Sequence, residues 1–370
     1  MKVALIHDHL AQDGGAEKVL KVLADMFPEA PIYTLLYEKK QVDKYFKYRH
    51  IETSVIQKLP GGVKHYQWYL VFMPIAVEFF DLSAYDLVIS DASAFAKGVI
   101  TKPDCLHICY CHTPTRYLWS DTHQYINNLK YNKWFKKIIS LALSRIRMWD
   151  RLAADRVDVF IANSKTVKNR IAKYYRRDST VIYPPVETEK YSVRDLSTQK
   201  SEEKYFLAGC RLAPYKMIDL VVETFKKLGD DYKLKIFGDG VDLNRLQEIA
   251  GEAKNIEFLG RVSEDDKVKL FENAQAFINP QEEDFGITVV ESMAAGRPVI
   301  AYRHGGATET VVEGKTGIFF DEQTVESLEK AIKEFKDINF KPQEIKEYAE
   351  QFSVANFKNQ INDFIAAHKR

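Results

Sequence analysis

Short apolar runs alternate with longer amphipathic segments along most of the chain. In the first half, VALIHDH at 3–9, YDLVIS at 85–90 and LHICYCH at 106–112 are strand-like, and segments with helical periodicity begin at Ala16 and Lys165. Strand-like runs that alternate with amphipathic helices are typical of a parallel sheet with crossover helices. The sequence therefore predicts an α/β fold, and VDVFIANS and STVIYPPV continue the same sheet.

The pattern restarts after residue 203 with six more apolar runs. Two α/β units in tandem account for this repetition. The strands are expected in KYFLAGC, YKLKIFG, NIEFLG, QAFINP, RPVIAY and TGIFF, and the helices at 218–228, 242–253, 265–274, 288–295 and 307–312.

A proline-bearing and then highly charged segment separates the two patterns, which is the composition of a link between domains. We expect one domain at 1–185, a linker at 186–203 and a second domain at 204–345. A chain of 370 residues exceeds the roughly 250–300 residues that one hydrophobic core serves. The tail at 346–370 is expected to be helical and to dock on the rest of the chain.

Within that tail, apolar residues recur at spacings that can share one helical face. They are Phe352, Phe357, Ile361 and Phe364.

The composition is that of an ordinary globular protein, with 46% hydrophobic and 28% charged residues. The 53 basic residues nearly balance the 52 acidic ones, so the overall charge does not indicate nucleic-acid binding. No apolar run reaches the ~18 residues of a membrane-spanning helix. The expected localisation is cytoplasmic, with peripheral attachment at the inner face of the cell membrane left open.

Three of the four cysteines lie at every second position of one short run, which also contains a histidine. These residues are Cys105, His107, Cys109 and Cys111. On a strand these side chains spread over some 20 Å at ~3.3 Å per residue, whereas tetrahedral zinc needs its ligands close together. A buried strand with reduced thiols is therefore expected, and no metal site.

An acidic loop and a short helix follow the run that ends near Pro280. Glu283 precedes the helix and Glu291 lies within it, and Gly296 ends it. The helix N-terminus then faces the carboxyl edge of the sheet, where free N–H groups and the helix dipole can hold a phosphate. Glu283 could reach a sugar beyond the phosphates, and Glu291 could bind ribose hydroxyls.

The whole segment EDFGITVVESMAAGRPVIA resembles the donor-binding motif of the retaining GT-B glycosyltransferases of family 4, or glycosyl transferases group 1. Other motifs of that family occur in order along nearly the whole chain. Within the family, the sequence most resembles the bacterial O-antigen and exopolysaccharide mannosyltransferases. The resemblance implies a GT-B fold, with two Rossmann-like domains whose parallel sheets face each other across a cleft. It also implies that the domain at 1–185 binds the acceptor, that the domain at 204–345 binds the nucleotide-sugar, and that the C-terminal helices return to the N-terminal domain.

The resemblance assigns roles to individual residues. Arg211 and Lys216, in GCRLAPYK, would contact the two donor phosphates, and His112 would contact the transferred sugar. The implied catalytic residues are His112, Arg211, Lys216 and Glu283, and the implied donor-binding residues are Gly14, Gly15, Gly238, Arg261, Val262, Phe285, Gly286, Ile287, Thr288 and Glu291.

Two groups of polar residues are open to more than one interpretation. Asp8 and His9, at the end of the first strand, could contact acceptor hydroxyls. Ser164, before a helix, is either a site residue or a simple N-cap.

No further carboxylate stands out as a nucleophile, so we expect same-face transfer. The leaving phosphate would accept the acceptor's proton while Arg211 and Lys216 stabilise its charge. Asp239 alone makes no metal-binding DxD motif, and no cofactor is expected besides the donor. Likeness to the mannosyltransferases favours GDP-mannose, with a UDP-sugar as the alternative, and a saccharide or polyprenyl-linked saccharide as acceptor.

Two aromatic, partly basic stretches at 64–80 and 125–156 remain. The second holds eight basic and two acidic residues among large apolar ones. Such a helix can lie on an anionic membrane surface, or it can pack with a solvated basic face.

Three other functions compete with this reading. They are a UDP-sugar-dependent transferase or epimerase, a non-catalytic subunit that binds nucleotide-sugar or glycan, and a dehydrogenase. The dehydrogenase is disfavoured because no GxGxxG follows the first strand.

Overall fold

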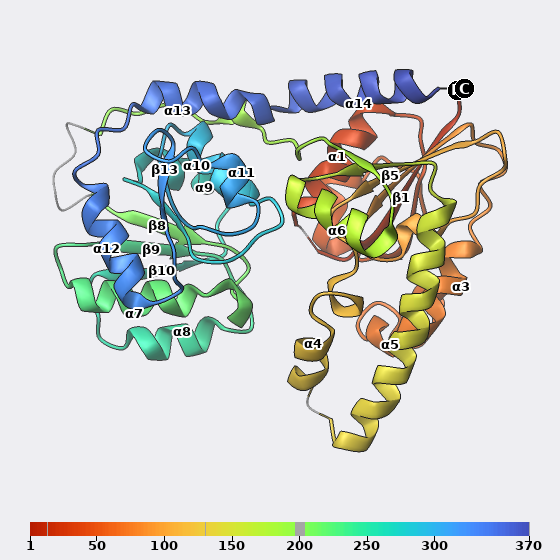
Figure 1. Cartoon of the computed structure of the whole chain (residues 1–370), viewed down its shortest axis with the longest axis horizontal. Coiled ribbons are helices and arrows are strands. Elements are labelled where there is room, and N and C mark those ends of the chain that lie inside the picture. Colours follow the sequence, from red (N-terminus) through yellow and green to blue (C-terminus); the bar gives the residue numbers. More distant parts are fainter. Residues whose placement is uncertain (13, 130, 197–203, 370) are drawn as a thin grey trace. The chain divides into compact units, whose positions relative to one another are not determined.

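The computed structural model describes residues 1–12, 14–129, 131–196 and 204–369, and it divides into two compact units (Figure 1). The first comprises Met1–Tyr183 with Phe357–Arg370, and the second comprises Pro184–Asn356. The change of unit at 183/184 falls next to the start of the expected linker, of which residues 197–203 lie outside the described part of the chain.

The first unit is built on a seven-stranded parallel sheet in the order β3-β2-β1-β4-β5-β6-β7. Its strands are β1 (Val3–Leu10), β2 (Ile32–Tyr37), β3 (Ile51–Thr53), β4 (Leu87–Ala92), β5 (Leu106–Cys111), β6 (Val159–Ala162) and β7 (Ser179–Val181). Its α-helices are α1 (Gly15–Met26), α2 (Lys39–Phe46), α3 (Met73–Glu78), α4 (Thr122–Asn128), α5 (Lys133–Ala153), α6 (Lys165–Tyr175) and most of α14 (Val354–His368).

Two strands of this sheet, β2 and β3, were not predicted from the sequence. Five of the six residues of β2 are fully buried, so it lacks the alternation that marks a half-exposed strand. β3 has only three residues, and it is recognisable only through its pairing with β2.

The second unit has a six-stranded parallel sheet in the order β10-β9-β8-β11-β12-β13. All six strands coincide with predicted runs: β8 (Phe206–Gly209), β9 (Leu234–Phe237), β10 (Ile256–Gly260), β11 (Phe277–Asn279), β12 (Val299–Tyr302) and β13 (Gly317–Phe320). The helices are α7 (Ile218–Leu228), α8 (Leu243–Ala250), α9 (Glu264–Asn273), α10 (Ile287–Ala294), α11 (Ala307–Thr310), α12 (Val325–Phe335) and α13 (Pro342–Ala349).

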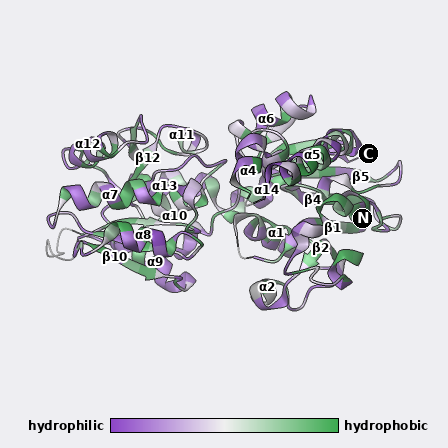
Figure 2. Ribbon diagram, turned by 90° about the horizontal axis from the view of Figure 1, so that it is seen from below, coloured by the Kyte–Doolittle hydropathy of each residue, from purple (hydrophilic) through white to green (hydrophobic). Residues whose placement is uncertain are grey.

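Each unit has its own apolar core around its sheet. Hydropathy colouring shows apolar residues along the strands and hydrophilic ones on the outer faces of the helices (Figure 2). Both faces of a parallel sheet are covered by crossover helices, which is why the strands read as continuous apolar runs. The expected fold class, two Rossmann-like α/β domains, is confirmed.

The C-terminal segment does not form one continuous apolar face. Ser353 separates a short turn that contains Phe352 from α14. Phe352 packs on Phe285 in the second unit, whereas Phe357 packs on Tyr110 in the first. The helix α13, which starts before the expected tail, lies with the second unit, and the chain rejoins the first unit at Phe357.

The strand order places a switch point at the centre of each sheet. In the first sheet, the connection after β1 runs to β2 on one side and the connection after β4 runs to β5 on the other side. The connections after β8 and β11 diverge in the same way in the second sheet. Loops at the carboxyl ends of such strands diverge and leave room for a ligand. The candidate functional residues of both units lie at these two edges.

Candidate active site

Three side chains meet at the carboxyl edge of the first sheet. Asp91, at the end of β4, accepts a hydrogen bond from His7 Nδ1 of β1 at 2.8 Å and one from His112 Nε2, just beyond β5, at 2.6 Å. Asp91 is buried, and His112 retains slight exposure. The parallel register aligns His7 with Asp91 on adjacent strands, which is what brings together residues more than 80 positions apart.

The surroundings favour charged forms of this group. Burial alone would lower the pKa of His7, but the hydrogen bonds and charges of Asp91 and Glu17 outweigh it and raise that pKa to about 10. Burial would raise the pKa of Asp91, but His112 and His7 hold it below its usual value. His7 therefore carries a proton at neutral pH, and Asp91 is an acceptor fixed between two imidazoles.

Asp8 does not face an acceptor. Its buried carboxylate accepts hydrogen bonds from four consecutive backbone N–H groups, those of residues 93–96, at 2.6–2.7 Å. A carboxylate satisfied in this way has no capacity left for a substrate hydroxyl. The expectation that Asp8 binds the acceptor is thus wrong, because Asp8 instead fixes the loop that follows β4.

The remaining candidates near this edge make local contacts. Ser164 caps α6 by accepting a hydrogen bond from the Val167 N–H at 3.1 Å, as the simpler interpretation held. The ring of His9 packs on Tyr66 at 5.1 Å, and burial lowers its pKa. Gly14 and Gly15 open α1, and the Gly14 N–H donates to the Glu17 carboxylate at 3.0 Å.

In the second unit, a lysine and a glutamate pair at the switch point. Lys216, from the loop after β8, donates a short hydrogen bond to Glu283 Oε1, in the loop after β11. Gln281 donates to the same oxygen at 3.0 Å. Burial would lower the pKa of Lys216, but the charge of Glu283 outweighs it and raises that pKa, so the ammonium stays charged.

Arg211 lies on the same loop as Lys216 and is exposed. Its Nη2 donates to the Tyr215 hydroxyl at 2.8 Å, and the Lys216 ammonium lies 5.0 Å from the centre of the Tyr215 ring. Tyr215 thus holds the two cations on one short loop. Two cations on one loop, one of them paired with the loop that leads into a helix, form a site suited to a phosphate or diphosphate.

The helix N-terminus is that of α10. Gly286 precedes it with a φ of +89°, a conformation that favours glycine, and Ile287 and Thr288 form its first turn. The first N–H groups of a helix have no carbonyl partner within it, so they can face an anion. The ring of Phe285 is buried against Phe352, so any ligand contact of Phe285 would come from its backbone.

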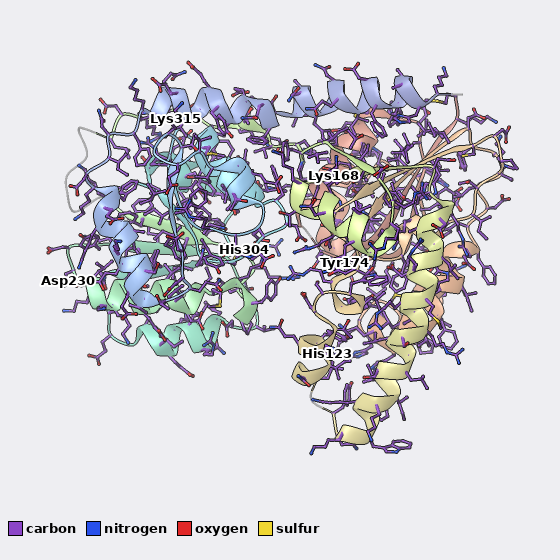
Figure 3. The ribbon with its side chains drawn as sticks, viewed as in Figure 1. His123, Lys168, Tyr174, Asp230, His304 and Lys315 are labelled. Atoms are coloured by element: carbon purple, nitrogen blue, oxygen red, sulfur yellow. The ribbon has the colours of Figure 1, made fainter. Side chains whose placement is uncertain are left out.

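A glycine pair that the sequence analysis overlooked supports this loop. The N–H of Gly306 donates to the Glu283 carbonyl at 2.8 Å, and a Cβ on Gly306 would lie 2.5 Å from Phe285 Cα. A Cβ on Gly305 would lie 2.4 Å from the Glu283 carbonyl oxygen. The Nδ1 atom of His304, labelled in Figure 3, lies 3.4 Å from Glu282 Oε2 in the same loop. The sequence shows this pair as a Gly-Gly two residues after the predicted strand RPVIAY.

Glu291 lies inside α10 and is buried. Its Oε1 accepts a hydrogen bond from Lys267 of α9 at 3.0 Å, a partner that the sequence did not suggest. The expected bond from Glu291 to a ribose would therefore form beside an existing ion pair.

The three remaining donor-binding candidates follow two neighbouring strands, β9 and β10. Gly238, after β9, has a φ of +120°, and a Cβ there would lie 1.9 Å from the Cys210 carbonyl oxygen. Only glycine permits the turn to approach the end of β8 so closely. Arg261 is exposed and Val262 half-buried directly after β10.

Within the described ranges, no cluster of three or more His, Cys, Asp or Glu side chains has the arrangement of a metal site. All four cysteines are free thiols, and Cys105, Cys109 and Cys111 are buried, as the strand interpretation predicted. None of the described helices has the length and apolar character needed to cross a bilayer.

Comparison with known families agrees with the geometry. Residues 13–190 match the family model Glycosyltransferase Family 4, and residues 192–352 match Glycosyl transferases group 1. Two such domains in succession, on two Rossmann-like sheets, define a glycosyltransferase of the GT-B fold. The chain belongs to the family 4 glycosyltransferases.

Two named relatives in sequence are also glycosyltransferases. Alpha-1,3/1,6-mannosyltransferase ALG2 of Dictyostelium discoideum is 26% identical over 86% of this chain and 85% of its own length. The O-antigen chain mannosyltransferase RfbU of Salmonella typhimurium is 28% identical over 59% of this chain and 62% of its own length. The latter match thus spans somewhat less than two thirds of either protein.

Solved structures agree on the fold. Anabaena Alr3699/HepE in complex with UDP superposes with a TM-score of 0.72 at 18% identity, covering 99% of this chain and 100% of that one. Sucrose-phosphate synthase from Thermosynechococcus elongatus gives a TM-score of 0.72 at 14% identity, with 99% of each chain covered. At this level of identity the likeness concerns the fold alone.

Proposed function

We propose that this protein is a retaining glycosyltransferase that moves mannose from GDP-mannose onto a glycan or lipid-linked saccharide. The observation that carries the proposal is the pairing of Lys216, on the same short loop as Arg211, with Glu283 in the loop that leads into α10, at the switch point of a glycosyltransferase domain. The choice of mannose rests on the names of several relatives that are mannosyltransferases, at 26–29% identity.

The second domain binds the donor in this proposal. Arg211, Lys216 and the first turn of α10 hold the diphosphate, and their positive charge stabilises the negative charge that grows as the sugar departs. Glu283, held by Lys216 and Gln281, accepts hydrogen bonds from hydroxyls of the sugar. Arg261 and Val262 lie where the nucleobase would bind, and Glu291 binds the ribose.

The first domain contributes His112 to the transferred sugar. Because Nε2 of His112 donates to Asp91, its Nδ1 is the atom left to contact substrate. Asp91 is thus a positioning residue that fixes the ring and its tautomer, and His7 holds Asp91 from the other side. This arrangement orients the imidazole without relying on the substrate.

Transfer on the same face needs no protein nucleophile and no metal. The acceptor hydroxyl attacks the anomeric carbon as the bond to the phosphate oxygen breaks, and that oxygen takes the acceptor's proton. The configuration is retained because attack and departure share one face. Arg211 and Lys216 carry out the charge stabilisation that a metal ion provides elsewhere.

The proposal is tested by incubating the purified protein with GDP-mannose, UDP-glucose or UDP-galactose and a polyprenyl-linked saccharide extract. We expect product and acceptor-dependent release of GDP from GDP-mannose, with an α-linked product by NMR. Release from a UDP-sugar alone would replace the donor assignment. Binding without turnover of any donor would indicate a non-catalytic subunit, and an inverted product would exclude the retaining mechanism.

A further inference from the structure

The helix α5 carries a row of large apolar side chains on its solvent face. They recur every three or four residues, or at twice that spacing, which places them along one line of the helix. Trp134 is 72% exposed, Leu141 64% and Leu152 63%. We call this row the α5 stripe, and its members are Trp134, Ile138, Leu141, Met148 and Leu152.

The α5 stripe is not the face by which the helix packs on the first domain. Leu143, Ile146, Asp150 and Ala153 point the other way and are buried. Asp150 is anchored by Lys97 at 2.5 Å, by Tyr175 at 2.9 Å and by hydrogen bonds from other side chains. The helix therefore has two apolar sides, of which only one is covered within the described domain.

A second exposed row lies on the segment that leads into α3. Trp68, Phe72, Ile75 and Phe79 recur at helical spacing and are each at least half exposed. This segment and α5 lie side by side in the first domain (Figure 1), where Trp149 Nε1 and Arg156 Nη1 both donate to Glu78 Oε1, at 2.8 and 2.6 Å. Most of the highly exposed large apolar side chains of the described chain belong to these two rows and their immediate neighbours.

The charge around the α5 stripe has one sign. Residues 131–149 contain five basic residues and no acidic one. Lys133, Lys137 and Arg145 are exposed, and none of the three makes an ion pair with a described residue. The cations therefore lie in solvent beside the apolar row.

We propose that the two rows and the surrounding cations form a docking surface for an anionic lipid bilayer. A bilayer supplies an apolar interior for the side chains and a negatively charged headgroup layer for the lysines and arginines. Tryptophan is suited to the boundary between the two. A second copy of this chain would instead set like charges against each other across the α5 stripe.

Flotation with vesicles tests this surface in the full-length protein. We expect binding to phosphatidylcholine vesicles that contain 30% phosphatidylglycerol, weaker binding to phosphatidylcholine alone, and release by high salt. Lys133→Glu with Lys137→Glu should lower partitioning at least about tenfold. The matched control is Lys254→Glu with Lys315→Glu, two exposed lysines of the second domain, of which Lys315 is labelled in Figure 3; this variant should bind like wild type.

The apolar component is tested separately. Leu141→Glu should reduce vesicle binding, whereas Tyr48→Glu, at an even more exposed aromatic position outside the two rows, should not. The fluorescence of Trp68 and Trp134 should shift to the blue when anionic vesicles are added, and this shift should shrink in Trp134→Phe. Thermal unfolding and donor binding should match wild type for all these variants, because none of the residues belongs to the proposed donor site.

Two results would overturn the proposal. The first is wild-type protein that does not float with anionic vesicles, or floats equally after both Leu141→Glu and the double lysine reversal. The second is a stable dimer that Leu141→Glu dissociates while leaving vesicle binding intact, because the stripe would then be covered by a second copy. Neither result bears on the donor assignment, which nucleotide release tests on its own.

Discussion

The edges of the two sheets hold their charged residues in different ways. In the first domain, Asp91 is buried and fully engaged by His7 and His112, and Asp8 is consumed by four backbone amides. In the second domain, Lys216 and Glu283 pair with each other at a partly exposed position, beside the exposed Arg211. One edge is a closed hydrogen-bond network, and the other consists of side chains that can exchange partners.

The difference indicates that the charged residues of the two domains have different roles. A buried, satisfied network fixes one imidazole in place and resists change. A solvent-facing pair of cation and carboxylate can open to receive a phosphate on the cation and a hydroxyl on the carboxylate. We therefore expect substitutions in the second domain to act through donor binding and charge stabilisation, and those in the first to act through orientation and stability.

The largest effect is expected at Lys216. Lys216→Ala removes a cation from the departing diphosphate and leaves Glu283 without its main partner, so kcat/KM should fall by about 1000-fold or more. Glu283→Ala should be similarly inactive. Steady-state assays on folded protein measure this, with the exposed Lys254→Ala as control. Wild-type turnover in either site variant would remove these residues from the mechanism.

A smaller loss is expected for Asp91→Asn. The amide retains the size of Asp91 but cannot accept from both imidazoles as a carboxylate does, so the ring of His112 loses its fixed orientation. We expect kcat to fall about 100-fold while the KM for the donor stays nearly constant. A rise in KM with unchanged kcat would mean that Asp91 serves donor binding instead. The pH profile of kcat should also shift, which a purely structural residue would not cause.

The loop under Glu283 should be sensitive to small changes of volume. Gly306→Ala would place a methyl group against the Phe285 backbone, and we expect a loss of about 2 kcal/mol in unfolding free energy together with weaker donor binding. Gly314→Ala is the comparison, since Gly314 has a φ of +73° but open space around it. It should cost about 1 kcal/mol and leave donor binding unchanged. Equal effects on donor binding would refute the supporting role of Gly306.

The smallest effect concerns the pH dependence of stability. The pKa of His7 is about 10 in the folded protein and lies near its ordinary value of 6.5 in the unfolded chain. The stabilisation is complete below pH 6.5 and is lost as pH rises towards 10, because the folded state holds a proton that the unfolded state releases. The His7 contribution should fall by roughly 1 kcal/mol between pH 7 and 8.

Urea unfolding at several pH values measures this slope. His7→Gln should flatten it, whereas a substitution of the exposed His123 on α4, labelled in Figure 3, should not. A slope that is the same in wild type and His7→Gln would show that His7 is not charged in the folded protein.

The sequence predicted the fold well where local pattern decides it. The strands of the second sheet follow apolar runs, and the helix α7 has the predicted bounds. β2 and β3 escaped prediction because complete burial and shortness remove the alternating signal. The helical face proposed for Phe352 and Phe357 failed because Ser353 interrupts the helix between them.

The sequence predicted the site residues that lie in family motifs. It did not predict which of them would be hydrogen-bonded to each other, because those partners lie on strands that are distant in sequence. Glu283 and Lys216 were both candidates, but their direct pairing depends on the order of β8 and β11. Asp91 follows an ordinary apolar run, and only the register of β1, β4 and β5 reveals that it joins His7 to His112. Asp8 looked available because its four amide partners lie 85 to 88 residues away.

Calorimetric titration of GDP into wild type and into an Arg211→Ala, Lys216→Ala double variant tests the central assignment most directly. If the two cations hold the diphosphate, wild type should bind GDP and the folded double variant should bind it at least about 100-fold more weakly. Equal affinity in the two proteins would place the nucleotide elsewhere and contradict the proposed donor site.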